Sequence, residues 1–312
     1  MRRYRVLHRT VYEYSDVVSS SYGRAYLTPR EFPGQRLLAH DTRVDPVPSD
    51  RSVGADVYGN TTLYFHVTAG HRRLEVTGES LVEVAPPAVP AAQPPWEQAR
   101  PGAGNGPLAV EFTLDLTPPE ITPEIAAYAA ESFPPGRPLL EAVRELTTRI
   151  HTDFAYESGS TTVSTSVADV FAERHGVCQD FARLGIACLR SQGLAARYVS
   201  GYLSTDPPPG KERMVGADAT HAWADVWLPG GAGRWIGFDP TNDQFADDRY
   251  VTVAWGRDYA DVPPLRGIIY TDARESTITV SVDVAPIPPD TAPIAPDTAP
   301  ISPDVGPAPA PE

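Results

Sequence analysis

The chain has 312 residues, which is longer than one hydrophobic core usually serves, so two folded domains are expected. It carries 40 Asp and Glu against 26 Lys and Arg, a net charge of -14 that repels phosphate backbones and anionic lipid. Nucleic acid and membranes are therefore not expected as partners, and because no long apolar run follows the N-terminal arginines, a cytoplasmic protein is expected.

Residues 1–84 alternate polar and apolar side chains with a period of two. The run YRVLHRTVYEYS is followed by DVYGNTTLYFHV, in which Gly59 and Asn60 separate two strand-like segments. Val, Thr and Tyr in this pattern, punctuated by Gly, Asn and Pro, predict an antiparallel β domain, which we expect to be a sandwich. The histidines scattered along it are expected to be ordinary strand or surface residues: His8, His40, His66 and His71.

Residues 85–107 are dominated by Pro, Ala and Gly, which sustain neither a helix nor a strand, so they predict a linker or long loop. ITPEIAAYAAESF and RPLLEAVRELTTRIHTDFAY then show helical spacing. They open a catalytic core expected over residues 108–285. Residues 286–312 repeat a Pro-rich heptapeptide without aromatic or cationic side chains, which predicts a disordered tail.

The segment VCQDFARLGIACLRSQG predicts a mostly buried helix that ends at Gly193. Cys178 falls in its first turn, where free N–H groups and the positive end of the helix dipole favour a thiolate, and Gly176 permits a tight entry. Arg183 is expected to brace this helix. A buried structural cysteine is the alternative, and it suits Cys188, in the middle of the helix, better.

Cys178 and Cys188 lie too far apart to pair. Ten residues of helix separate them, or roughly 15 Å along the axis, which excludes a disulfide. Free thiols fit a reducing compartment. The sequence also lacks a CxxC pair, an HExxH motif and an EF-hand loop, so no metal is expected.

The segment THAWADVWLPGGAGRWIGFDPTND predicts a hairpin of strands 221–228 and 234–239. If Leu228 lies opposite Arg234, then His221 and Asp239 share one face as diagonal neighbours, roughly 7 to 8 Å apart along the backbone. Their side chains can close that gap with a hydrogen bond. A cysteine nucleophile needs such a base and an acceptor that orients it, so the sequence predicts a Cys178–His221–Asp239 site.

These two segments, with the intervening ARYVSGY, resemble the transglutaminase-like superfamily, in the bacterial branch with a β-rich N-terminal region. The resemblance covers roughly residues 1 to 285. It implies an α+β fold with a papain-like core, in which Cys178 is the nucleophile, His221 the general base and acid, and Asp239 the orienting carboxylate. No acidic loop matches the calcium sites of the animal enzymes, so no cofactor is expected.

One departure concerns the stabilisation of the oxyanion. The animal enzymes use a tryptophan upstream of the cysteine, whereas the nearest upstream aromatic residues here are Phe154 and Tyr156. The Cys178 N–H is expected to be one donor, and either Tyr156 or Gln179 the second. Trp223 is expected to wall the cleft, with packing as the alternative.

These residues together predict cysteine-dependent acyl transfer on a peptide or protein amide through a thioester. Release by water gives a protease, isopeptidase or deamidase, which we favour, and release by an amine gives a true transglutaminase. A binding module built on an inactive core is the alternative of another class. The sequence does not determine the substrate or the oligomeric state.

Overall fold

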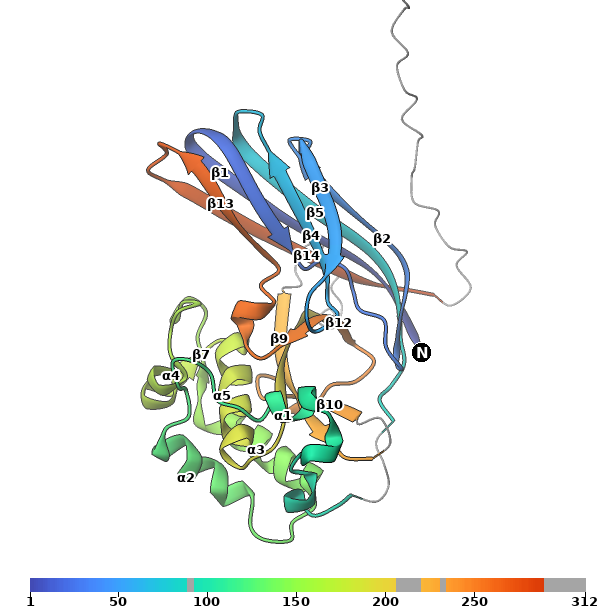
Figure 1. Cartoon of the computed structure of the whole chain (residues 1–312), viewed down its shortest axis with the longest axis vertical. Coiled ribbons are helices and arrows are strands. Elements are labelled where there is room, and N and C mark those ends of the chain that lie inside the picture. Colours follow the sequence, from blue (N-terminus) through green and yellow to red (C-terminus); the bar gives the residue numbers. More distant parts are fainter. Residues whose placement is uncertain (89–92, 206–219, 231–233, 289–312) are drawn as a thin grey trace, which may run out of the picture.

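The computed structural model describes residues 1–88, 93–205, 220–230 and 234–288, and these form an α+β fold in two parts (Figure 1). The first part is a seven-stranded antiparallel sheet, and the second is a helical part built on a five-stranded sheet. The strands of the first sheet are β1 (Arg2–Ala25), β2 (Gln35–Asp45), β3 (Asp50–Ala55), β4 (Thr61–Val67), β5 (His71–Val84), β13 (Leu265–Thr271) and β14 (Ser276–Ile287).

Strand β1 organises the first sheet because its 24 residues reach across both halves. Its first half pairs with β5 and β14, and its second half pairs with β4 and β13. The register shifts between Glu13 and Val18 and again between Val18 and Ser20. Such irregularities bend a strand and increase its twist.

The seven strands are hydrogen-bonded into one continuous sheet, and β1 takes part in both of its halves. Side chains of β1, β2, β4 and β5, among them Val44, Phe65 and Val76, form a hydrophobic cluster within this part, and a core of this kind is what the expected sandwich requires. Tyr4 and Val6 of β1 belong to another cluster, which includes Phe181 and Leu184 of the second part. The N-terminal sheet therefore has a core of its own and also packs against the second part.

The boundary expected at residue 285 also differs from the structure. Residues 265–287, assigned from the sequence to the catalytic core and the start of the tail, form β13 and β14 and pair with β1 along its length. Alternation of apolar and polar residues identifies a strand but not its partner, so the sequence pattern does not reveal this return to the N-terminal sheet. The tail beyond residue 288 lies outside the described residues.

The second part contains an antiparallel sheet of order β11-β10-β9-β8-β12. Its strands are β8 (Ala196–Leu203), β9 (Thr220–Leu228), β10 (Arg234–Asp239), β11 (Gln244–Phe245) and β12 (Tyr250–Gly256). Its helices are α1 (Pro107–Glu111), α2 (Pro123–Ser132), α3 (Leu139–Asp153), α4 (Val167–Glu173) and α5 (Cys178–Ser191). A short parallel pair, β6 (Ala155–Tyr156) with β7 (His175–Gly176), precedes α5, and the 3-10 turn η3 (Tyr259–Asp261) follows β12.

The predicted linker is more ordered than its composition indicates. Its described part contains the 3-10 turns η1 (Trp96–Ala99) and η2 (Ala103–Asn105), while residues 89–92 lie outside the described residues. Trp96 is buried in the hydrophobic cluster that contains residues of both parts, which we call the main cluster. Its indole N–H donates to the Pro134 carbonyl at 3.0 Å. One large aromatic side chain thus anchors a segment whose Pro and Gly residues disfavour regular structure.

Helix α5 packs on one face of the five-stranded sheet. The apolar face of the hairpin, which includes Ala224, Val226 and Phe238, belongs to the same hydrophobic cluster as the helix. The approach is close: a Cβ at Gly185 would lie 2.9 Å from the Phe238 ring. In the part of the chain that the structure describes, no helix has the length and apolar character to cross a membrane.

Candidate active site

Cys178 is the first residue of α5, as the sequence predicts. The first intrahelical bond runs from the Phe181 N–H to the Val177 carbonyl at 3.1 Å, so the N–H groups of Cys178 and Gln179 precede the helical ladder. The Cys178 side chain is partly exposed, whereas Cys188 is fully buried in the main cluster. Burial raises the pKa of the Cys188 thiol to about 12, which suits the structural role expected for it.

The turn that leads into α5 is held by Asp180. Its carboxylate accepts the Val177 N–H at 2.9 Å and the Thr161 hydroxyl at 2.6 Å. A Cβ at Gly176 would lie 2.9 Å from this side chain. Glycine is therefore required here because the carboxylate approaches closely, and not because of a left-handed backbone.

The hairpin has the predicted register. Arg234 pairs with Leu228 and Phe238 with Ala224, which places His221 and Asp239 on the same face. The predicted hydrogen bond between them is present, with 2.7 Å between His221 Nε2 and Asp239 Oδ2. Cys178 lies close enough to His221 to help raise the pKa of its ring, and both side chains line the same cavity. Because Nε2 is engaged by Asp239, Nδ1 is the ring nitrogen left for the sulfur.

Asp239 is completely buried and accepts hydrogen bonds from several groups besides His221. The Tyr250 hydroxyl and the Asn242 side-chain amide each donate to Oδ2 at 2.7 Å, and the Thr241 N–H donates to Oδ1 at 2.9 Å. Neither Tyr250 nor Asn242 is predicted from the sequence. Asn242 follows Asp239 in the quoted motif, but Tyr250 comes from the far edge strand β12, which no local pattern connects to the site.

This arrangement determines the charges of the pair. Burial disfavours the charged ring of His221, but the hydrogen bonds to Asp239 and Cys178 outweigh it and raise the pKa of His221 above its ordinary value. Burial also acts against the carboxylate, yet His221, Asn242 and Tyr250 hold the pKa of Asp239 below its ordinary range. The geometry favours an imidazolium between the Asp239 carboxylate and the sulfur of Cys178.

Cys178 and His221 open into a cavity of about 200 Å³ between the two parts of the molecule. One wall comes from the second part of the molecule. The other wall comes from the N-terminal sheet: from β1, from the first residue of β13, and from β14. The lining residues are His8, Thr10, Tyr12, Cys178, Gln179, Tyr198, Ser200, Thr220, His221, Ala222, Tyr259, Pro264, Leu265, Ile278 and Val280. Within the described residues, no three His, Cys, Asp or Glu side chains are grouped so as to hold a metal ion.

His8 is one of the histidines expected to be ordinary strand residues, and it lies in this second wall. It is 1% exposed, with Nδ1 3.0 Å from the Tyr202 hydroxyl and Nε2 3.0 Å from the Thr10 hydroxyl. Burial lowers the pKa of His8 to about 4. His8 is therefore a neutral, hydrogen-bonded residue of the cavity wall.

The remaining predicted residues lie around the site at different depths. Gln179 lines the cavity. Tyr156 is 55% exposed outside the lining, although partial burial and, secondarily, the neighbouring Cys178 raise its pKa. Trp223 is not part of the lining either: it is buried, with its ring centroid 6.1 Å from that of His221 and 5.1 Å from that of Tyr250. Trp223 thus packs behind His221, which is the alternative considered for it.

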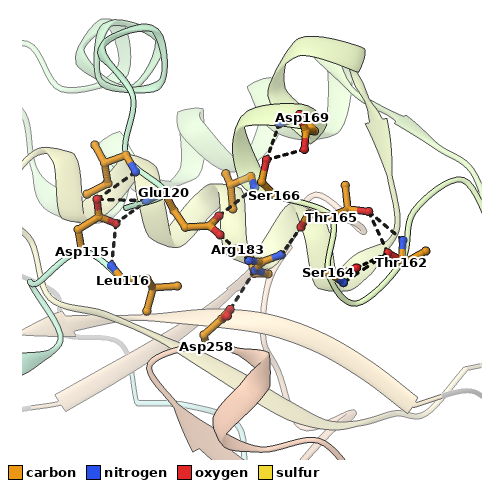
Figure 2. Close-up of polar contacts among 12 residues, drawn as sticks. Asp115, Leu116, Glu120, Thr162, Ser164, Thr165, Ser166, Asp169, Arg183 and Asp258 are labelled. Atoms are coloured by element: carbon orange, nitrogen blue, oxygen red, sulfur yellow. Dashed lines mark hydrogen bonds and ion pairs between the residues drawn. The ribbon is translucent and has the colours of Figure 1, made fainter. Parts of the chain in front are cut away.

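Arg183 braces α5, as expected (Figure 2). Its guanidinium donates to the Thr165 carbonyl at 2.7 Å and to Glu120 at 2.8 Å, and its Nε lies 2.9 Å from Asp258. These partners come from three separate segments of the chain. The catalytic helix is therefore fixed to the loops around it.

Comparison with known proteins agrees with this fold and geometry. Residues 4–83 match the bacterial transglutaminase-like N-terminal region, and residues 126–240 match the transglutaminase-like superfamily. An uncharacterized protein of Mycobacterium tuberculosis is 63% identical over 292 residues, which cover 91% of this chain and 93% of the relative. An uncharacterized protein of Mycobacterium leprae is 33% identical over 91% of this chain and 99% of the relative.

Among solved structures, a protein of Cytophaga hutchinsonii named as a putative cysteine protease superposes with a TM-score of 0.70. The two chains are 20% identical, and the match covers 94% of this chain and 93% of the other. At that identity the likeness concerns the fold, which includes both parts of the molecule. The chain belongs to the transglutaminase-like superfamily, with the bacterial N-terminal region of that family preceding the core.

Proposed function

We propose that this protein is a cysteine-dependent enzyme that cleaves an amide of a peptide or protein, with Cys178 as nucleophile, His221 as general base and acid, and Asp239 as orienting carboxylate. The observation that carries the proposal is the position of His221, which is hydrogen-bonded to Asp239 and lines the same cavity as Cys178, close enough for Cys178 to help raise its pKa. Both reactive side chains open into the cavity.

In the first step, the Cys178 thiol gives its proton to His221, and the resulting thiolate attacks the amide carbonyl carbon. The carbon–nitrogen bond breaks, and the His221 imidazolium gives that proton to the departing amine, which leaves a thioester and a neutral His221. In the second step, water attacks the thioester while His221 accepts its proton, and the acid leaves as the sulfur is released. The N–H groups of Cys178 and Gln179 are well placed to stabilise the oxyanion because they precede the helical ladder.

We favour water over an amine as the second nucleophile, and the name given to the Cytophaga hutchinsonii neighbour points the same way. The two outcomes differ in product. A glutamine-containing protein substrate incubated with a biotinylated alkylamine should be cleaved or deamidated without incorporation of biotin. Incorporation of biotin that requires Cys178 would assign the protein to the amine transferases instead.

Alkylation of Cys178 tests the proposed roles without a known substrate. In a Cys188→Ser background, iodoacetamide labelling followed by intact mass should be rapid at about pH 6, well below the range in which ordinary thiols ionise. His221→Ala should slow it on the order of 100-fold while the fold is retained. If His221→Ala leaves the rate unchanged, the proposed function fails, and a binding module built on this fold becomes the better account.

A further inference from the structure

The second wall of the cavity contains a group of apolar side chains that the proposed chemistry does not use. Tyr12 of β1 and Ile278 and Val280 of β14 all line the cavity. Ile278 is 58% exposed and Val280 is 47% exposed. We call these three residues the apolar shelf. Large apolar side chains that remain accessible beside a reactive centre commonly mark a binding surface.

The sheet register shows that the shelf faces the catalytic residues. Tyr12 pairs with Ile278, and Thr10 pairs with Val280, so their side chains lie on one face of the sheet. Tyr4 and Val6, further along β1 with the same parity, pack into the main cluster with the catalytic part. The shelf is therefore the part of this interface at which the two walls separate and leave space.

The cavity has an inner polar region and an outer apolar one. His8 and Thr10 are buried and hydrogen-bonded to each other, so they form a closed inner surface. Ile278 and Val280 are the exposed members of the lining, so solvent reaches this part of the described wall.

The kinds of side chain that line the cavity indicate which substrate side chain fits there. In a chain with a net charge of -14, the described residues that line the cavity include no Asp, Glu, Lys or Arg. An engineered apolar cavity of roughly 150 Å³ already accepts benzene, so 200 Å³ provides room for one large side chain next to the reacting amide. Apart from the His221 ring, a charged substrate side chain would lose hydration in the cavity without gaining a counter-ion among the described lining residues.

We propose that the apolar shelf is a specificity subsite that binds one aliphatic side chain of the substrate beside the scissile amide. The inference rests on the proposed function and names its substrate class: peptides or proteins with an uncharged, apolar residue next to the bond that is cleaved. Tyr12, Ile278 and Val280 act by burying that side chain and do not take part in the proton transfers.

Peptide chloromethyl ketones test the shelf, because the sulfur of Cys178 displaces chloride and records each binding event as a covalent adduct. The reagents are acetyl-X-Gly and acetyl-Gly-X chloromethyl ketones with X as Leu, Ala or Glu, used on the full chain carrying Cys188→Ser. In one of the two series, the Leu reagent should react on the order of 10-fold faster than the Ala reagent, and the Glu reagent should be slowest.

The double variant Ile278→Thr with Val280→Thr should bring the Leu and Ala rates within about threefold of each other, because it removes about half of the apolar surface that would favour the Leu reagent. Thr keeps the β-branched shape that suits a strand, so folding is preserved. Ile268→Thr is the matched control: Ile268 lies in the same sheet with 65% exposure but outside the cavity lining, and its replacement should leave the preference intact.

Iodoacetamide separates failure of the shelf from failure of the proposed function, since it is too small to need the shelf. A rapid, His221-dependent iodoacetamide reaction combined with equal Leu and Ala rates in the parent protein overturns the shelf alone. Retention of the parent preference by the double variant also overturns the shelf alone. An iodoacetamide reaction that does not depend on His221 overturns the proposed function and the shelf with it.

Discussion

The two walls of the cavity each contribute one histidine with little exposure, and the two differ in charge. His221 lies in the catalytic part and has a carboxylate and a thiol as partners, whereas His8 lies in the N-terminal sheet and has two hydroxyl groups. The pKa of His221 is raised, and burial lowers the pKa of His8 to about 4. Burial alone therefore does not decide the state of a histidine here; the charge of its partners does.

The largest expected change in the labelling rate of Cys178 comes from removing the negative charge of Asp239, the partner of His221. Asp239→Asn keeps the size of the side chain but removes its charge and places an NH₂ group among the donors Tyr250 and Asn242. The pKa of His221 should fall, and iodoacetamide labelling of Cys178 at about pH 6 should slow roughly 100- to 1000-fold.

Asp243→Asn provides the matched control for Asp239→Asn. Asp243 lies four residues further along, contacts Thr148, and does not touch His221. The labelling rate should stay unchanged in this variant. Equal rates for wild type and Asp239→Asn would show that the carboxylate does not sustain the imidazolium.

A smaller effect is expected at Tyr250, which acts through Asp239 as a positioning residue. Tyr250→Phe removes one hydrogen bond to the carboxylate, so the pKa of Asp239 should rise. The labelling rate should fall about 3- to 10-fold, and its acid limb should move to higher pH.

Tyr202→Phe is the matched control for Tyr250→Phe. It removes the same hydroxyl group, but from a tyrosine that is hydrogen-bonded to His8 and not to Asp239. Its labelling profile should overlay that of the wild type. An unshifted acid limb in Tyr250→Phe, with only a uniform loss of rate, would reduce Tyr250 to a packing role.

The smallest effect is expected for His8→Gln, and it concerns stability instead of reactivity. The folded-state pKa of about 4 lies below the unfolded value of about 6.5, so the unfolded chain binds the proton first as the pH falls. The free energy of unfolding of the wild type should decrease from about pH 6.5 toward pH 4 because of His8.

Urea denaturation at about pH 7 and pH 5 measures this contribution. Between these values, the wild type should lose about 1 to 2 kcal/mol more than His8→Gln. The opposite sign applies to His221, whose stabilising contribution is present below its unfolded pKa and is lost as the pH rises through the folded value. Identical losses in wild type and His8→Gln would contradict the neutral state assigned to His8.

The catalytic half of the site is predictable from the sequence because its signals are local. A helix start positions Cys178, and one hairpin register positions His221 relative to Asp239. Both depend on residues within a short stretch of chain, where the helical and strand periodicities are informative. The superfamily resemblance rests on the same stretches.

The other half depends on long-range pairing, which periodicity does not reveal. His8 and Ile278 are about as far apart in sequence as the chain allows, yet β1 and β14 are neighbours in the sheet. Tyr250 reaches Asp239 from an edge strand in the same way. Tyr156 is a candidate only because it lies upstream of Cys178 in the sequence, and the structure leaves it half exposed and outside the cavity lining.

Nitrogen NMR of the histidine rings tests the central claim most directly, because it reports the protonation of both walls in one sample. Spectra of a ¹⁵N-labelled protein, with His221→Ala and His8→Gln used for assignment, should show both His221 nitrogens protonated at about pH 7.5, above the ordinary histidine range. His8 should still carry a single ring proton at about pH 5. A His221 ring that loses its proton at or below about pH 6.5 would contradict the account.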